Sequence, residues 1–229
     1  MIPWELIGTA RLPGDGGELR LTRRGAEFSL RLDDYELMNS RAHASEDALA
    51  TLACAKLVNA KSARVLVGGL GMGFTAAAAL KLLGPKAQVV VAELSPEVIE
   101  WNKGPLSELA GHPTKDRRTK VVESDVVELI HGAKDAWDAM LLDVDNSPEG
   151  LTRTANDRLY SPEGLAAAMK ALRPGGVLAV WSATPSKPFT RRLKQAGFQV
   201  SETIVRARTS GGGGRGGQHT IWLAVRPPQ

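Results

Sequence analysis

The feature that most constrains the fold is a glycine cluster between an apolar strand and an alanine-rich helix. After Arg64, the segment 64–67 (RVLV) is apolar and largely β-branched, and residues 75–80 (TAAAAL) have high helix propensity. Between them lie Gly69, Gly71 and Gly73. Glycine lets a ligand approach the main chain, and the free N–H groups of a helix start favour electron-rich groups. The turn is therefore compatible with a bound nucleotide, although a glycine-rich turn without a ligand explains the pattern equally well.

From residue 64 onward, apolar strands alternate with helical patterns, and this predicts a parallel sheet with helices on both faces. We expect an α/β, doubly wound, mostly parallel sheet that ends in a C-terminal antiparallel hairpin, because residues 198–206 and 220–225 read as strands with no helix between them. The other expected strands are 88–92, 119–122, 139–142 and 177–181, and the expected helices are 96–109, 126–131, 162–172 and 189–196.

The first fifty residues have a different pattern. Short alternating segments at 6–12, 18–23 and 27–32, separated by glycine-rich turns, predict a small antiparallel β region. Residues 33–46 read as irregular, and Ser45 is expected to cap a helix that runs to Ala60. We therefore predict two domains, a small β region at residues 1–45 and a Rossmann-like nucleoside-binding domain at residues 46–229.

Composition excludes several function classes. The chain has no run of about 18 apolar residues and no signal-peptide pattern, so we expect a soluble cytoplasmic protein without membrane contact. The net charge of +4 is spread along the chain and aromatic residues make up only 5%, which argues against nucleic acid as a partner. The four histidines are scattered without ligand spacing, and no metal is expected.

Acidic residues follow the predicted strands at their carboxyl ends, where ligands bind in open parallel sheets. Glu93, at the end of the second strand, is placed to accept both hydroxyls of a ribose. After the third strand, Ser124 and Asp125 either hold an adenine or cap the next helix. A dinucleotide dehydrogenase would need a third glycine where Phe74 stands, so that alternative fits less well.

The fourth strand leads into several polar residues. Asp143 follows the apolar run directly, and a carboxylate there is costly unless it is used or solvated, which makes it the leading candidate for a residue at the reacting centre. Asp145 and Asn146 follow closely, and a turn explains them as well as a site does.

The order of these motifs resembles the spermidine synthase family, within the S-adenosylmethionine-dependent methyltransferases of Rossmann-like fold. The resemblance covers residues 33–183, and Ser45-Glu46 also fits the family's layout. It rests on the glycine turn and on the segments 93–99 (ELSPEVI), 116–118 (DRR), 124–125 (SD), 137–143 (WDAMLLD), 159–160 (LY) and 173–178 (RPGGVL).

The resemblance implies that Gly69 and Gly71 approach the nucleoside's tail, with Gly73 in the same turn, and that Asp143 faces an acceptor amine. It also implies that Glu93 holds the ribose and Asp125, beside Ser124, reads the adenine. On the acceptor side it implies Asp145 as a second catalytic acid and Glu46, Asn146 and Tyr160 as substrate contacts. A small-molecule acceptor and a homodimer are further implications.

Three departures from the family pattern bear on the reaction. The family usually carries an aspartate in the glycine turn to hold the amino tail, whereas this chain has Leu70 and Met72. Asp143 and Asp145 have one residue between them rather than two, and the family's tyrosine falls near Gly164. The sequence therefore predicts methyl transfer from S-adenosylmethionine or a related sulfonium nucleoside to a small acceptor such as an amine.

Three alternatives stay open at this point. One is aminopropyl transfer from decarboxylated S-adenosylmethionine to a polyamine. The others come from different classes, namely a nucleic-acid-binding module and a non-catalytic nucleoside-binding protein.

Overall fold

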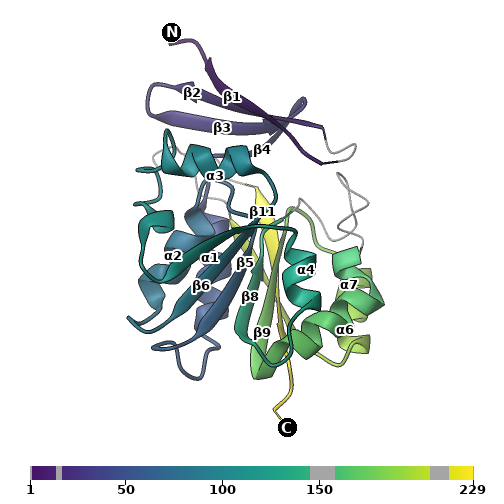
Figure 1. Ribbon diagram of the computed structural model, residues 1–229. Coiled ribbons are helices and arrows are strands. Elements are labelled where there is room, and N and C mark those ends of the chain that lie inside the picture. The colour runs from purple at the N-terminus through teal and green to yellow at the C-terminus, as the bar shows by residue number, and fades with distance from the viewer. Residues whose placement is uncertain (1, 14–16, 145–157, 207–216, 229) are drawn as a thin grey trace.

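The computed structural model describes residues 2–13, 17–144, 158–206 and 217–228. The described chain contains two sheets, one of four strands near the N-terminus and one of seven strands. Figure 1 shows the smaller sheet above the larger one, across the ends of its central strands. The ends of the parallel strands therefore have a roof made by another part of the same chain.

The smaller sheet is antiparallel, in the order β1 (Glu5–Arg11), β2 (Glu18–Arg24), β3 (Glu27–Leu32) and β4 (Tyr35–Asn39). The first three strands were predicted, with small differences at their ends. The prediction of an irregular segment at 33–46 is wrong, because β4 pairs with β3. The segment YELMN is short, and only pairing with an existing strand makes it extended.

The larger sheet has the order β10-β11-β9-β8-β5-β6-β7. All neighbours pair in parallel except β11, which is antiparallel to both β9 and β10. This confirms the doubly wound, mostly parallel sheet with its C-terminal hairpin. The strands are β5 (Arg64–Gly68), β6 (Gln88–Glu93), β7 (Thr119–Glu123), β8 (Trp137–Leu142), β9 (Leu172–Ser182), β10 (Gln199–Arg206) and β11 (Gln218–Val225).

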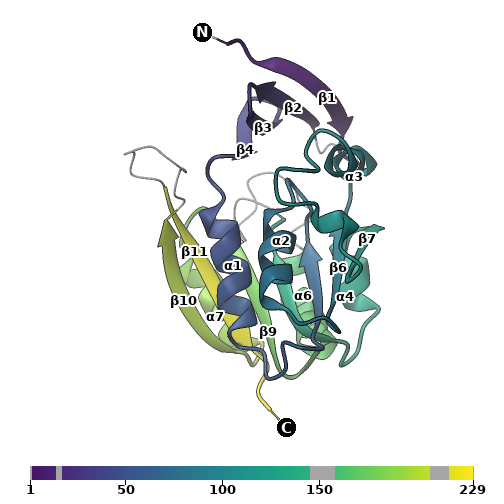
Figure 2. The ribbon, with the colours of Figure 1, turned by 90° about the vertical axis from the view of Figure 1, so that its left-hand side faces the viewer.

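Helices cover both faces of the larger sheet, as the turned view in Figure 2 shows. Buried residues of α1, α2 and α3 pack in one apolar cluster, and those of α4, α6 and α7 pack in a second one. Their bounds are α1 (Ala44–Cys54), α2 (Phe74–Leu82), α3 (Pro96–Lys103), α4 (Val126–His131), α6 (Pro162–Ala171) and α7 (Lys187–Gln195), with a 3₁₀ turn at Pro113–Lys115.

Two predicted helices are shorter than expected. α1 ends at Cys54 rather than Ala60, and α3 ends at Lys103, where Gly104 follows as its C-cap. Ser45 is not the cap of α1. It lies inside the helix, where its hydroxyl donates to Glu46, and His43 occupies the N-cap position.

The strands alternate between the two clusters. Val65, Val67 and Leu141 belong to the first cluster, whereas Leu66 and Met140 belong to the second. The inward residues of the four-stranded sheet also belong to the first cluster, so that sheet and α1 to α3 share one core. None of the helices in the described part of the chain is long and apolar enough to cross a membrane. The predicted boundary between residues 45 and 46 stays a prediction.

Leu21→Ala tests whether the small sheet is part of the shared core. Leu21 is fully buried, so its truncation should lower the free energy of unfolding by about 2–5 kcal/mol. Leu6→Ala, on the neighbouring strand at 57% exposure, should change it by less than about 0.5 kcal/mol. Urea unfolding at 25 °C measures both, and equal small losses would contradict a shared core.

Candidate functional site

A cavity of about 190 Å³ lies between the carboxyl ends of the central strands and the inner face of the four-stranded sheet. Its position matches the general rule for open sheets, because the strand order reverses around β5. The wall made by the strand ends carries Gly69, Gly71, Glu93, Ser124, Asp125 and Asp143, and α1 adds Glu46. The roof made by the small sheet carries Leu12, Leu19, Leu30, Leu32, Leu37 and Met38.

The glycine turn lies in tight contact with the end of β8. Gly69, Gly71 and Gly73 all have left-handed backbone angles, with φ of 85°, 50° and 86°. A Cβ atom at Gly69 would lie 2.7 Å from the carbonyl oxygen of Asp143. Side chains are therefore excluded from this position by both conformation and space.

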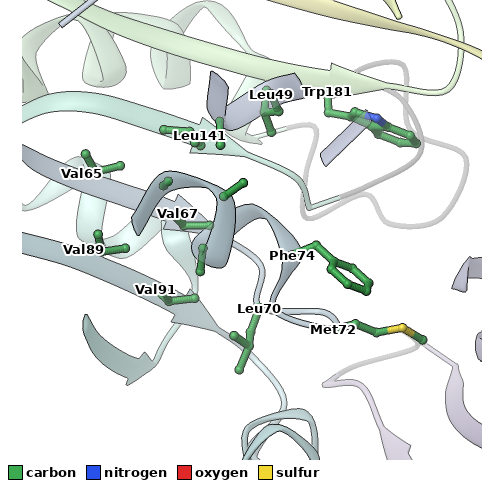
Figure 3. Close-up of a cluster of buried hydrophobic side chains, with 14 of the residues drawn as sticks. Leu49, Val65, Val67, Leu70, Met72, Phe74, Val89, Val91, Leu141 and Trp181 are labelled. Atoms are coloured by element: carbon green, nitrogen blue, oxygen red, sulfur yellow. The ribbon is translucent and has the colours of Figure 1, made fainter. Parts of the chain in front are cut away.

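The turn presents its main chain to the cavity rather than charged side chains. Leu70 and Met72 are 5% and 0% exposed and belong to the first apolar cluster, and Figure 3 shows them with Val67 and Phe74. The space beside Gly71 is filled from the roof, because a Cβ atom there would lie 2.9 Å from the thioether of Met38. No carboxylate in the turn can hold an amino tail.

Glu93 ties the glycine turn to the end of β6. Its carboxylate accepts N–H bonds from Leu70 at 2.8 Å, Leu94 at 2.8 Å and Ser95 at 2.9 Å. The side chain is 8% exposed and still lines the cavity. A carboxylate has about four acceptor positions, so one is left for a ligand hydroxyl. The ribose role predicted from sequence stays a prediction, and the bracing of the turn was not foreseen.

Asp125 is the N-cap of α4, where its carboxylate accepts the Val127 N–H at 2.9 Å. The capping alternative for this position is therefore confirmed. Ser124 and Asp125 also line the cavity, together with Val126 at the start of the helix. Contact with an adenine stays a prediction, and capping is compatible with it because the Val127 N–H bonds to only one of the two carboxylate oxygens.

Glu46 and Asp143 form the acidic centre of the cavity. Glu46, on α1, is 6% exposed, and Asp143 follows β8 and accepts the Thr75 hydroxyl at 2.9 Å. Burial, the larger cause, and the nearby charge of Asp143 together raise the pKa of Glu46 to about 7. Burial likewise raises the pKa of Asp143 to about 6, against the hydrogen bond from Thr75. The pair can therefore hold or accept a proton near neutral pH.

An aromatic contact fixes α1 beside the glycine turn. The rings of His43 and Phe74 stack with centroids 4.0 Å apart and planes 10° from parallel. His43 Nδ1 also lies 2.9 Å from a carboxylate oxygen of Asp47. His43 is the N-cap of α1 and Phe74 is the first residue of α2. The stack therefore joins the helix that carries Glu46 to the helix whose Thr75 binds Asp143. In the sequence Phe74 was recognised only as a misfit to a glycine pattern.

The remaining predicted site residues are not brought into the cavity by the described structure. Tyr160 is 3% exposed and packs edge-on against Phe189 at 5.3 Å, in the second apolar cluster. Asp145 and Asn146 lie outside the described residues. In the described ranges no group of three or more metal-ligating side chains could hold a metal ion.

Sequence reasoning missed the apolar roof and Trp181, which also lines the cavity. Alternation along the predicted strands indicates which leucines point to one side of the small sheet. It does not indicate that this side faces a cavity, because the docking of two sheets is a tertiary property.

A family model described as spermine/spermidine synthase domain matches residues 43–205. The polyamine aminopropyltransferase of Mycobacterium tuberculosis (strain H37Rv) is 30% identical over 204 residues, which cover 85% of this chain and 37% of that protein. The polyamine aminopropyltransferase of Korarchaeum cryptofilum is 30% identical over 119 residues, covering 52% of this chain and 35% of the relative. The chain spans little more than a third of the length of these relatives.

Solved structures show the same fold. The crystal structure of a spermidine synthase from Thermotoga maritima matches with a TM-score of 0.78 at 19% identity, covering 98% of this chain and 74% of the other. A spermidine synthase in complex with the transition-state analogue AdoDATO matches with a TM-score of 0.76 at 18% identity, covering 98% and 73%. At these identities the likeness concerns the fold.

Glu46→Gln should change how stability depends on pH. A carboxyl whose pKa is raised from 4.5 to about 7 by folding stabilises the protein below pH 4.5, and this contribution is lost as pH rises to 7. The variant should therefore gain about 1–3 kcal/mol relative to the unmodified protein between pH 5 and pH 8.

Urea unfolding at the two pH values measures this gain. Glu100→Gln is the matched control, since that side chain is 67% exposed and its ion pair with Lys103 lies in solvent. The control should change stability by less than about 0.5 kcal/mol at either pH. A Glu46→Gln variant that is no more stable relative to the unmodified protein at pH 8 than at pH 5 would contradict the assignment.

Proposed function

The chain belongs to the spermine/spermidine synthase domain family, and from that membership we propose that it transfers an aminopropyl group from decarboxylated S-adenosylmethionine to an amine nitrogen. The single observation that carries this proposal is the buried pair Glu46 and Asp143, placed beside a main-chain glycine turn in one cavity. Such a pair attracts an ammonium group and can accept a proton from it.

The donor would occupy the wall made by the strand ends. Glu93 would accept one ribose hydroxyl at its remaining acceptor position, and Asp125 with the Val126 N–H would hold the adenine edge, as these residues line the cavity. Gly69 and Gly71 would lie against the tail, where any larger residue would clash with Asp143 or Met38. These contacts would orient the sulfonium toward Glu46 and Asp143. Orientation of this kind lowers the activation barrier of the transfer step.

The transfer itself needs one proton acceptor. The acceptor binds as an ammonium ion beside Asp143 and Glu46 and gives a proton to the Asp143 carboxylate. The freed nitrogen lone pair attacks the aminopropyl carbon bound to sulfur, the carbon–sulfur bond breaks, and its electron pair stays on sulfur. The products are a secondary ammonium ion, which carries the positive charge that was on sulfur, and neutral methylthioadenosine. The protein contributes position and proton transfer, and the sulfonium supplies the leaving group.

Methyl transfer from S-adenosylmethionine, the function expected from the sequence, remains a second candidate. Its support is the absence of an acid in the glycine turn, where Leu70 and Met72 are buried. The named relatives, all polyamine aminopropyltransferases or spermidine synthases, favour aminopropyl transfer.

Titration calorimetry with the two nucleosides separates these candidates. We expect the decarboxylated form to bind at least tenfold tighter, about 1.4 kcal/mol, because the carboxylate of S-adenosylmethionine would face Glu46 and Asp143. Methylthioadenosine and NAD serve as positive and negative controls. Tighter binding of S-adenosylmethionine would support methyl transfer, and absence of binding by all three sulfur nucleosides would reject both candidates.

Asp143→Asn tests the proton-transfer role. The amide cannot accept the proton, so kcat should fall by about 100-fold or more while nucleoside affinity changes by less than about threefold. Asp135→Asn is the control, since Asp135 pairs with Arg226 and does not line the cavity. An Asp143→Asn variant with unchanged kcat would refute the role. Nucleoside binding with no turnover of any amine by the unmodified protein would indicate a non-catalytic nucleoside-binding protein.

A further inference from the structure

A buried asparagine of α3 is bonded to the glycine turn. Asn102 is 2% exposed, and its side-chain amide donates to the Gly71 carbonyl at 2.8 Å and to the Val98 carbonyl at 2.9 Å. Asparagine is a weak helix former, and a buried amide is costly unless it is hydrogen-bonded. A residue that departs from local sequence preference in this way is expected where function requires it. The bond to the turn supplies such a requirement.

Two different side chains hold successive residues of the turn. The Glu93 carboxylate accepts the Leu70 N–H at 2.8 Å, which ties the first part of the turn to the end of β6. Asn102 holds the next residue, Gly71, by its carbonyl oxygen and from α3. Loss of the Asn102 side chain would therefore leave the bond between Glu93 and Leu70 in place.

Gly71 is the part of the turn that most needs to be held. Its φ is 50°, and a glycine backbone has more accessible conformations than that of any other residue. It lines the cavity, where the Met38 side chain packs beside it. Because the peptide unit is planar and trans, a fixed Gly71 carbonyl also fixes the direction of the Met72 N–H. Asn102 thereby sets the orientation of the main chain at this part of the cavity.

We propose that Asn102 is a positioning residue for the donor, which holds Gly71 in the conformation against which the aminopropyl tail of the sulfonium nucleoside binds. This inference rests on the proposed function, because it concerns the donor site of that reaction. Asn102 acts through Gly71, since among the described lining residues α3 supplies Val98 and not Asn102. Its effect is confined to the tail, because Glu93, on the ribose side, is held independently.

The affinities of two nucleosides test this role. Decarboxylated S-adenosylmethionine and methylthioadenosine share the adenosine part, and only the first carries the aminopropyl group. In Asn102→Ala, affinity for the decarboxylated nucleoside should fall about tenfold, which corresponds to about 1.4 kcal/mol, the size of one hydrogen bond. Affinity for methylthioadenosine should change by less than about threefold, because the contacts of Glu93 remain. Titration calorimetry with the full chain measures both affinities.

Asn102→Ser is the matched variant. A serine hydroxyl can still bond to the carbonyl four residues earlier, at Val98, but the side chain is too short to reach Gly71. This variant should lose as much donor affinity as Asn102→Ala. An Asn102→Ser variant with unchanged donor affinity would show that the bond within α3, and not the bond to the turn, matters, and would overturn the inference.

Leu165→Ala controls for a loss of stability alone. Leu165 is 1% exposed in the second apolar cluster, and it does not line the cavity. Its truncation should lower the temperature of unfolding and leave both nucleoside affinities within about twofold of the unmodified protein. Thermal unfolding of all three variants shows that each is folded.

The outcomes separate this inference from the proposed function. A loss of affinity that is confined to the decarboxylated nucleoside in both Asn102 variants supports the inference. Unchanged affinity for this nucleoside, or a loss at least as large for methylthioadenosine, overturns the inference and leaves the proposed function standing. Absence of binding of decarboxylated S-adenosylmethionine to the unmodified protein overturns the proposed function and, with it, the inference.

Discussion

The close approach between the glycine turn and the end of β8 is the constraint on which the site depends. A Cβ atom at Gly69 would lie only 2.7 Å from the carbonyl oxygen of Asp143. The ends of β5 and β8 can therefore meet only because position 69 has no side chain. Glu93 then ties the turn to β6 through three main-chain N–H groups. Three neighbouring strand ends are thereby held as one rigid surface, and rigid elements hold functional groups in place better than loops do.

The acid pair depends on that surface and on the roof above it. Two carboxyls near each other in a buried cavity resist ionisation. The raised pKa values of Glu46 and Asp143 reflect the free-energy cost of charging them. An arrangement of this kind is unfavourable for the empty protein at neutral pH. It becomes favourable when a cation arrives, because the cation neutralises the charge that burial penalises. The stack of His43 on Phe74 joins the start of α1, which carries Glu46, to the start of α2, which carries Thr75, the hydrogen-bond partner of Asp143.

Strand and helix order, the C-terminal hairpin and the acids at strand ends could be predicted, because periodicity and glycine placement are local signals. Asp125 illustrates the limit, since one residue can cap a helix and still line a cavity, and only geometry shows that both hold. β4 was missed because its five residues become extended by pairing with β3. Tyr160 directly precedes α6, and packing in the second apolar cluster buries it against Phe189 of α7, which the sequence pattern alone does not indicate.

The cavity is built by two stretches of chain that are well separated in sequence. Its wall comes mainly from residues 69–144, with Glu46 and Trp181 beside them, and its roof comes from residues 12–38. Substitutions in the first forty residues can therefore change one side of the cavity while the side made by the strand ends keeps its contacts. The bonds from the glycine turn to Glu93 and its close approach to Asp143 do not involve the small sheet, so the two sides can vary independently.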